Sequence, residues 1–89
     1  MMYPYLTFAD ETEVTHSQII ENDGKQIIEV HFERPTEKGF DTARCRLPDY
    51  HWIKKEGYTD EEVAAFEIFL QHNAHLLYKY AANGGISIA

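Results

Sequence analysis

The chain has 89 residues, of which 44% are hydrophobic and 13% aromatic, and it carries a formal net charge of -7. This length suits one domain with a small core, and the apolar content excludes wholesale disorder. The acidic balance disfavours nucleic acid and anionic membranes as partners, and the one cysteine, Cys45, excludes an internal disulfide framework. No apolar run reaches membrane-spanning length and the first residues lack a signal-peptide layout, so we expect a cytoplasmic protein with no membrane partner.

We expect a single domain over residues 1–89. Its parts, in chain order, are a β-meander, a helical part and a short tail, at 1–47, 48–83 and 84–89. The charge is unevenly spread, with a net charge of -6 in residues 1–33, +3 in 34–55 and -4 in 56–89. An acidic partner would therefore be expected to bind the middle segment.

The first half of the chain predicts three or four antiparallel strands. Aromatic and β-branched residues are concentrated in four runs, at 3–9, 14–21, 26–33 and 40–47. Asp23-Gly24 joins the second run to the third and is a strong signal for a tight hairpin. The segment 34–39 contains Pro35, which cannot donate to a ladder, so a loop is expected there.

Alternation with a period of two predicts the two faces of this sheet. In the third run, the polar face carries Glu29, His31 and Glu33. Bringing the apolar faces of the third and fourth runs together places Glu29 opposite Arg44. The same exercise at the Asp-Gly turn places His16 opposite His31.

The second half of the chain predicts helices. Residues 49–56 are expected to form a short helical segment that ends at Gly57. Thr59 followed by Glu62 is a capping box, so a long helix is expected to begin there and to end near Ala82. Its apolar residues cover one broad arc at 100° per residue. The sequence thus predicts an α+β fold: an antiparallel meander of three to four strands, a short helical segment and one long C-terminal helix packed on the sheet.

The candidate interaction surface is a basic stripe made of Arg34, Arg44 and Arg46. Arg44 and Arg46 are two positions apart and so lie on the same side of a strand, where guanidinium groups can hold carboxylate or phosphate. Alternatively, the stripe only neutralises Glu29 and Glu33 of the neighbouring strand. The favoured partner is an acidic protein or a second copy of this chain.

A second candidate is a polar site on the same face, where His16, His31, Glu29 and Glu33 are expected to converge. Imidazole and carboxylate bind divalent metals and perform acid–base chemistry, so these residues support a small metal-dependent enzyme as one alternative. Asn73 lies within the apolar arc of the helix. It is expected either to tie the helix to a neighbouring strand or loop, or to contact a ligand.

The signatures of common enzymes are missing: the chain has no Gly-rich phosphate loop, no Gly-x-Ser-x-Gly and no Cys-x-x-Cys. Cys45 alternates with two arginines that point to the other side of the strand, so it is expected to be a small core residue. We therefore expect no catalytic residue, cofactor or metal. The expected function is that of a non-catalytic binding or regulatory module that acts through protein–protein contacts, made either by the basic stripe or by exposed apolar residues such as Ile68 on the outer face of the long helix.

The chain also resembles a group of short uncharacterised bacterial proteins over residues 40–82. The resemblance is carried by a strand end, a Gly-aromatic-Thr helix start and an Asn-x-x-Leu-Leu helix: Leu47, Gly57-Tyr58-Thr59, and Asn73, Leu76 and Leu77. Those proteins carry paired histidines in a strand, of which only His31 is matched here. Some are encoded beside small partner proteins in the manner of toxin–antitoxin pairs. The resemblance implies a small bacterial accessory protein and, as an alternative function, the antitoxin-like member of a two-protein system.

Overall fold

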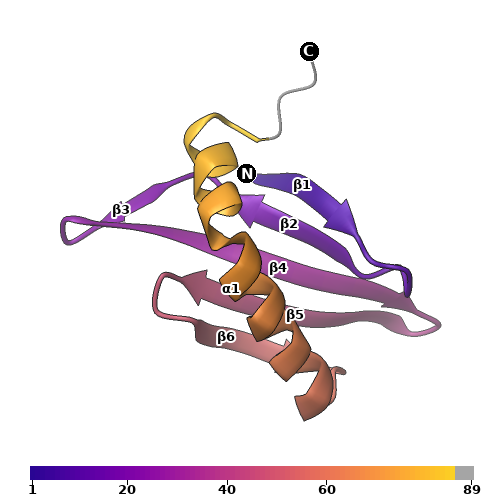
Figure 1. Cartoon of the computed structure of the whole chain (residues 1–89). Coiled ribbons are helices and arrows are strands. Elements are labelled where there is room, and N and C mark those ends of the chain that lie inside the picture. The colour runs from indigo at the N-terminus through magenta and orange to yellow at the C-terminus, as the bar shows by residue number, and fades with distance from the viewer. Residues whose placement is uncertain (86–89) are drawn as a thin grey trace.

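The computed structural model describes residues 1–85, which form an antiparallel sheet of six strands with one long helix across one of its faces (Figure 1). The strands and the helix are, in chain order, β1 (Met2–Thr7), β2 (Glu13–Ser17), β3 (Ile20–Asn22), β4 (Lys25–Thr36), β5 (Gly39–Leu47), β6 (His51–Glu56) and α1 (Asp60–Ala82). The main sheet has the order β1-β2-β4-β5-β6, and β3 pairs with β4 beyond the end of β2. The helix covers one face, so the described residues leave the other face uncovered. The last part of the predicted tail, residues 86–89, lies outside the described residues.

The α+β class and the single C-terminal helix on an antiparallel sheet are confirmed, but the strand count of three to four and the short helical segment are wrong. Residues expected to be helical form the edge strand β6, which pairs with β5. This segment contains Trp52 and Ile53, and aromatic and β-branched side chains favour a strand where the edge of a neighbouring strand is open. The run at 14–21 is also divided, into β2 and β3.

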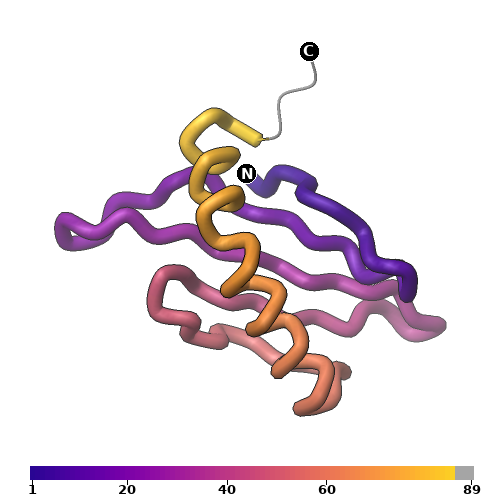
Figure 2. The backbone as a smooth tube through the Cα atoms, viewed as in Figure 1, coloured from indigo at the N-terminus to yellow at the C-terminus, as the bar shows by residue number. Residues whose placement is uncertain are grey.

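The helix begins where the capping box predicts. Thr59 Oγ1 accepts from the backbone N–H of Glu62 at 3.1 Å, and the Glu62 carboxylate accepts from the backbone N–H of Thr59 at 3.0 Å. The helix ends at Ala82. Beyond it, Gly85 lies so close to Tyr3 that an added Cβ would be 3.1 Å from the ring. The end of the helix therefore meets the start of the sheet, as the backbone trace in Figure 2 shows.

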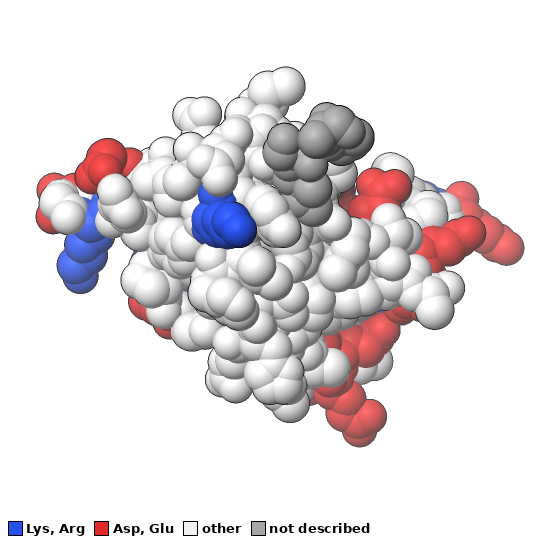
Figure 3. All heavy atoms as spheres, turned by 45° about the horizontal axis from the view of Figure 1, so that its top comes forward, with Lys and Arg blue, Asp and Glu red and all other residues white. Residues whose placement is uncertain are grey.

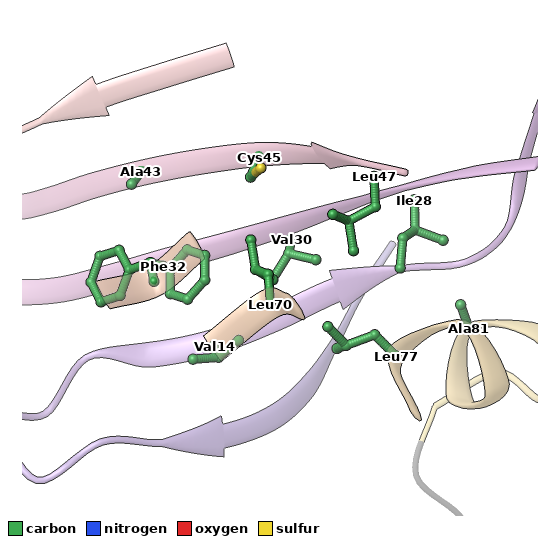
Figure 4. Close-up of a cluster of buried hydrophobic side chains, with 11 residues drawn as sticks. Val14, Ile28, Val30, Phe32, Ala43, Cys45, Leu47, Leu70, Leu77 and Ala81 are labelled. Carbon is green, nitrogen blue, oxygen red and sulfur yellow. The ribbon is translucent and has the colours of Figure 1, made fainter. Parts of the chain in front are cut away.

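The buried core lies between the helix and the sheet. Phe32 of β4 stacks on Phe66 of α1 with the ring centroids 4.2 Å apart, and Phe8 stacks on Phe66 at 6.1 Å. The buried hydrophobic side chains of this core, most of them labelled in Figure 4, are Val14, Ile28, Val30, Phe32, Ala43, Cys45, Leu47, Phe66, Leu70, Leu77 and Ala81. Burial of each large side chain contributes about 1.5–3 kcal/mol, which fixes α1 on this face of the sheet.

The β4–β5 hairpin has the predicted faces, but its register differs by two residues from the prediction. Glu29 pairs with Arg46 rather than with Arg44. The two strands continue through the segment expected to be a loop, where Pro35 pairs with Phe40. Because the pleat has a period of two, a shift of two leaves every side chain on its predicted face.

The pairing of β2 with β4 is displaced by one residue relative to the pairing of β3 with β4, and this displacement moves side chains to the other face of the sheet. In β3 the Asp-Gly hairpin keeps its predicted register, with Ile20 opposite Ile27. In β2, Thr15 lies opposite His31, and His16 lies opposite Val30. The prediction that His16 faces His31 is therefore wrong. The displacement turns His16 toward the helix and leaves His31 on the uncovered face.

Candidate functional site

The uncovered face of the sheet is organised in rows that run across the strands. The central row consists of His31, Arg44 and Lys54, which lie opposite one another on β4, β5 and β6. Adjacent strands are about 4.8 Å apart, so the central row is a short line of groups able to carry positive charge. The acidic row on one side of it contains Glu13, Glu33 and Glu56, and the mixed row on the other side contains Glu29, Arg46 and His51.

Arg34 does not belong to this face. Its position along β4 has the parity of the core residue Phe32, so it lies on the helix side of the sheet. Its guanidinium donates to Asp41 at 2.8 and 3.0 Å, to Glu62 at 2.7 Å and to Asp10 at 3.0 Å. Hydrogen bonds to Glu62 and then to Asp41 raise the pKa of Arg34. Arg34 therefore joins the β1–β2 turn, β5 and the helix N-terminus, and it is not an exposed cation.

The arginine node, defined as Arg34 with Asp10, Asp41 and Glu62, depends on a glycine. Gly57 has a φ of +87°, and a Cβ at this position would overlap the carboxylate of Asp41. Hydrogen bonds from Thr12 first, and then Arg34, lower the pKa of Asp10, and a hydrogen bond from the backbone of Thr59 first, and then Arg34, lower the pKa of Glu62. The node is thus a set of ionised groups that holds three segments of the fold together.

Arg44 and Arg46 both lie on the uncovered face, but their surroundings differ. Arg46 donates to Asp49 at 2.8 and 3.3 Å, which raises the pKa of Arg46 and lowers the pKa of Asp49. Arg44 has no carboxylate oxygen within 4 Å among the described residues, and its Nε is buried without a hydrogen-bond partner. The residue opposite Arg44 on β6 is a second cation, Lys54, whose Nζ lies 3.7 Å from a carboxylate oxygen of Glu56. The charge of Arg44 is therefore not neutralised within the described part of the chain.

The structure does not bring the predicted polar site together. His16 is fully buried on the helix side, where Nδ1 lies 2.8 Å from the Ser17 carbonyl oxygen and Nε2 has no hydrogen-bond partner. His31 lies on the opposite face, with Nε2 3.1 Å from Glu29 Oε1. Glu33 lies in the acidic row. Residues 1–85 contain no group of three or more His, Cys, Asp or Glu side chains that could hold a metal ion.

Asn73 ties the helix to β1. Its Oδ1 accepts from the Tyr5 hydroxyl at 2.7 Å, and its Nδ2 donates to the Phe69 carbonyl oxygen at 2.8 Å. Burial raises the pKa of Tyr5, which keeps the hydroxyl protonated as a donor. Both ends of the Asn73 amide are thus engaged inside the fold, which is the first of the two roles expected for this residue.

Sequence reasoning missed an apolar groove of about 510 Å³ between the β1–β2 turn and the helix. Its lining residues are Phe8, Ala9, Asp10, Glu62, Ala65, Phe66 and Phe69. The aromatic residues of the groove were visible in the sequence as parts of two separate apolar segments. Their meeting depends on how the helix crosses the sheet, which no local pattern encodes.

No family model matches the chain, and no curated protein or solved structure matches it. The resemblance to short bacterial proteins, and the two-protein arrangement that it implies, therefore stay predictions. No helix within residues 1–85 is both long and apolar enough to cross a membrane.

Proposed function

We propose that the chain is a non-catalytic binding module whose uncovered sheet face receives an acidic segment of a partner protein. The observation that carries this proposal is Arg44, which lies in the central row with no carboxylate within 4 Å in the described part of the chain. Arg34 and Arg46, by contrast, are paired with the chain's own acids. A cation that the fold leaves unneutralised is a ready partner for an incoming carboxylate.

The unpartnered Nε of Arg44 adds to this argument. A buried donor without an acceptor costs about 1–3 kcal/mol. A small rotation of the side chain toward an incoming carboxylate gives the Nε–H an acceptor and removes that cost. Binding at Arg44 would therefore be favoured by relief of desolvation as well as by opposite charge.

The neighbouring rows restrict what can bind. Glu13, Glu33 and Glu56 would repel negative charge on one side of the central row. A ligand with one or two carboxylates above Arg44 and Lys54 fits, whereas a uniformly negative polymer would meet the acidic row. This pattern favours an acidic peptide segment over nucleic acid, whose phosphates repeat at a fixed short spacing.

The test is an NMR titration of the isotope-labelled chain with a short peptide that carries two glutamates between neutral residues as the probe. We expect amide shifts concentrated in β4, β5 and β6, with affinity that falls as salt is added. Arg44→Gln should weaken binding about tenfold, because it removes one charge-assisted pair. Lys25→Gln, an exposed cation in the β3–β4 hairpin, is the matched control and should leave the affinity unchanged.

Two results would reject the proposal. One is a set of shifts confined to the helix side of the molecule. The other is equal affinity of the Arg44→Gln and Lys25→Gln variants, which would show that the probe responds to positive charge in general rather than to the central row.

A further inference from the structure

The solvent-facing side of α1 is unusually poor in charge. Its exposed positions between Glu61 and Lys79 are Ala64, Ala65, Ile68, Gln71, His72 and His75. Figure 3 shows a broad surface of uncharged side chains with a basic side chain within it and acidic side chains gathered toward its margins. Ile68 is 55% exposed within this surface. A solvated helix ordinarily places charged residues on such a face, so this one has the composition of a contact surface.

The charged residues at the two ends of this face, Glu61 and Lys79, point in the same direction from the helix. Glu61 and Lys79 are eighteen positions apart in a continuous helix, which is about five full turns, so both point in the same direction and lie about 27 Å apart. Both side chains are exposed, and neither has an ion-pair partner among the described residues. The face therefore has an acidic end, a middle without Asp, Glu, Lys or Arg, and a basic end.

From this pattern we infer that the outer face of α1 binds the same face of a second copy of this chain, with the two helices antiparallel about a twofold axis. The axis passes beside the midpoint between Glu61 and Lys79. Glu61 of each copy then faces Lys79 of the other, and both ion pairs form at once. A second copy of this chain is thus the partner whose charges complement those of this face at both of its ends.

The middle of the face fits the same symmetry. Positions equally far from the midpoint face each other across the axis, so Ile68 of one copy meets His72 of the other, and Ala65 meets His75. The small Ala65 opposite His75 allows the helices to approach to about the 8–10 Å of ordinary helix packing. The apolar groove adjoins this surface at Ala65, which lines both.

Net charge also favours this face over others for self-association. Two copies that each carry a charge of -7 repel each other. Contact through the middle of α1, which has no Asp, Glu, Lys or Arg on its exposed face, keeps the acidic margins apart. A contact made mainly by one helix from each copy is small, so we expect a weak, salt-sensitive dimer rather than an obligate one.

The test is a charge-reversal exchange followed by sedimentation equilibrium of the full chain. Glu61→Lys alone and Lys79→Glu alone each place like charges at both ends of the interface, so each variant should be monomeric. An equimolar mixture of the two variants should dimerise again, because every end then carries one positive and one negative charge. Glu37→Lys and Lys38→Glu, exposed residues of the β4–β5 turn, are matched controls and should behave as the wild-type chain does.

Ile68→Asp is a second, independent variant. Ile68 is 55% exposed, so the change should leave the fold intact by circular dichroism while abolishing the dimer. The inference is overturned if the wild-type chain is monomeric up to about 1 mM, the range of weak specific association, and the face then belongs to a different partner. It is also overturned if a dimer forms and survives Ile68→Asp or either charge reversal.

Discussion

Replacement of Arg34 by Met should destabilise the fold by about 2–3 kcal/mol. The Arg34 and Asp41 side chains are 23% and 20% exposed, so their paired hydrogen bonds contribute about 1 kcal/mol. Glu62, at 32% exposed, adds about 0.5–1 kcal/mol, and Asp10, at 48% exposed, adds only a few tenths. Loss of the cation over the Tyr58 ring, now 4.7 Å away, costs about 0.5 kcal/mol more.

Thermal unfolding followed by circular dichroism measures this loss. For a chain of this size, 2–3 kcal/mol should lower Tm by about 10–20 °C. Met keeps the unbranched stem over Tyr58, so the change reports the charge rather than the packing. Arg46→Met is the matched control: its pair with Asp49 has side chains that are 37% and 51% exposed, so this variant should lose much less stability than Arg34→Met.

The pH dependence of folding stability gives a second test of the arginine node. The pKa values of Asp10 and Glu62 are lowered in the folded state, so the stability that they contribute is present at neutral pH and is lost as pH falls through these lowered values. Without Arg34, the three carboxylates repel one another when ionised, so acidification should cost the variant less than it costs the wild-type chain. Equal losses of stability from Arg34→Met and Arg46→Met, with the same acid response in both, would refute the reasoning.

Three further outcomes follow from the core and the helix ends. Burial first, and the charges of Glu67 and Asp49 next, raise the pKa of Cys45 to about 12, so the thiol should react with a disulfide reagent only on unfolding. The free energy of unfolding should also fall as pH rises above about 9, because the thiol then ionises in the unfolded chain but not in the folded one. Tyr5→Phe should cost about 1–2 kcal/mol because it leaves an acceptor of Asn73 unpaired, and a double-mutant cycle with an Asn73 variant in urea denaturation should show coupling of about 1 kcal/mol. Thr59→Ala should cost about 1 kcal/mol of thermal stability by removing the helix cap, whereas exposed Ala64→Ser should cost less.

Features that depend on neighbouring residues were predictable from the sequence. The start of the helix follows from Thr59 and Glu62, whose side chains satisfy each other's backbone N–H groups within one turn. The Asp-Gly hairpin has its predicted register because a two-residue turn fixes the pairing beside it. The two faces of β4 and β5 follow from alternation, which survives any error of two residues in the register.

The candidate surfaces were less predictable, because a single residue of slip or a distant partner decides them. The one-residue displacement in pairing between β2 and β3 separates His16 from His31, and no short sequence pattern predicts this displacement. Among the three predicted arginines, Arg34 is bonded to acids that are 7, 24 and 28 positions away and Arg46 is paired with Asp49, whereas Arg44 has no ion pair within residues 1–85.

The sequence by itself determined the class of the fold, the long capped helix and which side chains of the central hairpin share a face. These depend on interactions within a turn of helix or along one strand, whose periods are fixed by backbone geometry. Only the tertiary structure decided that residues 51–56 form an edge strand, that Arg34 is enclosed by three carboxylates, and that one sheet face and one helix face are left without a covering element in residues 1–85. Those outcomes depend on which distant segments meet, and the free energy of such contacts is set by the whole packed core rather than by any short stretch of residues.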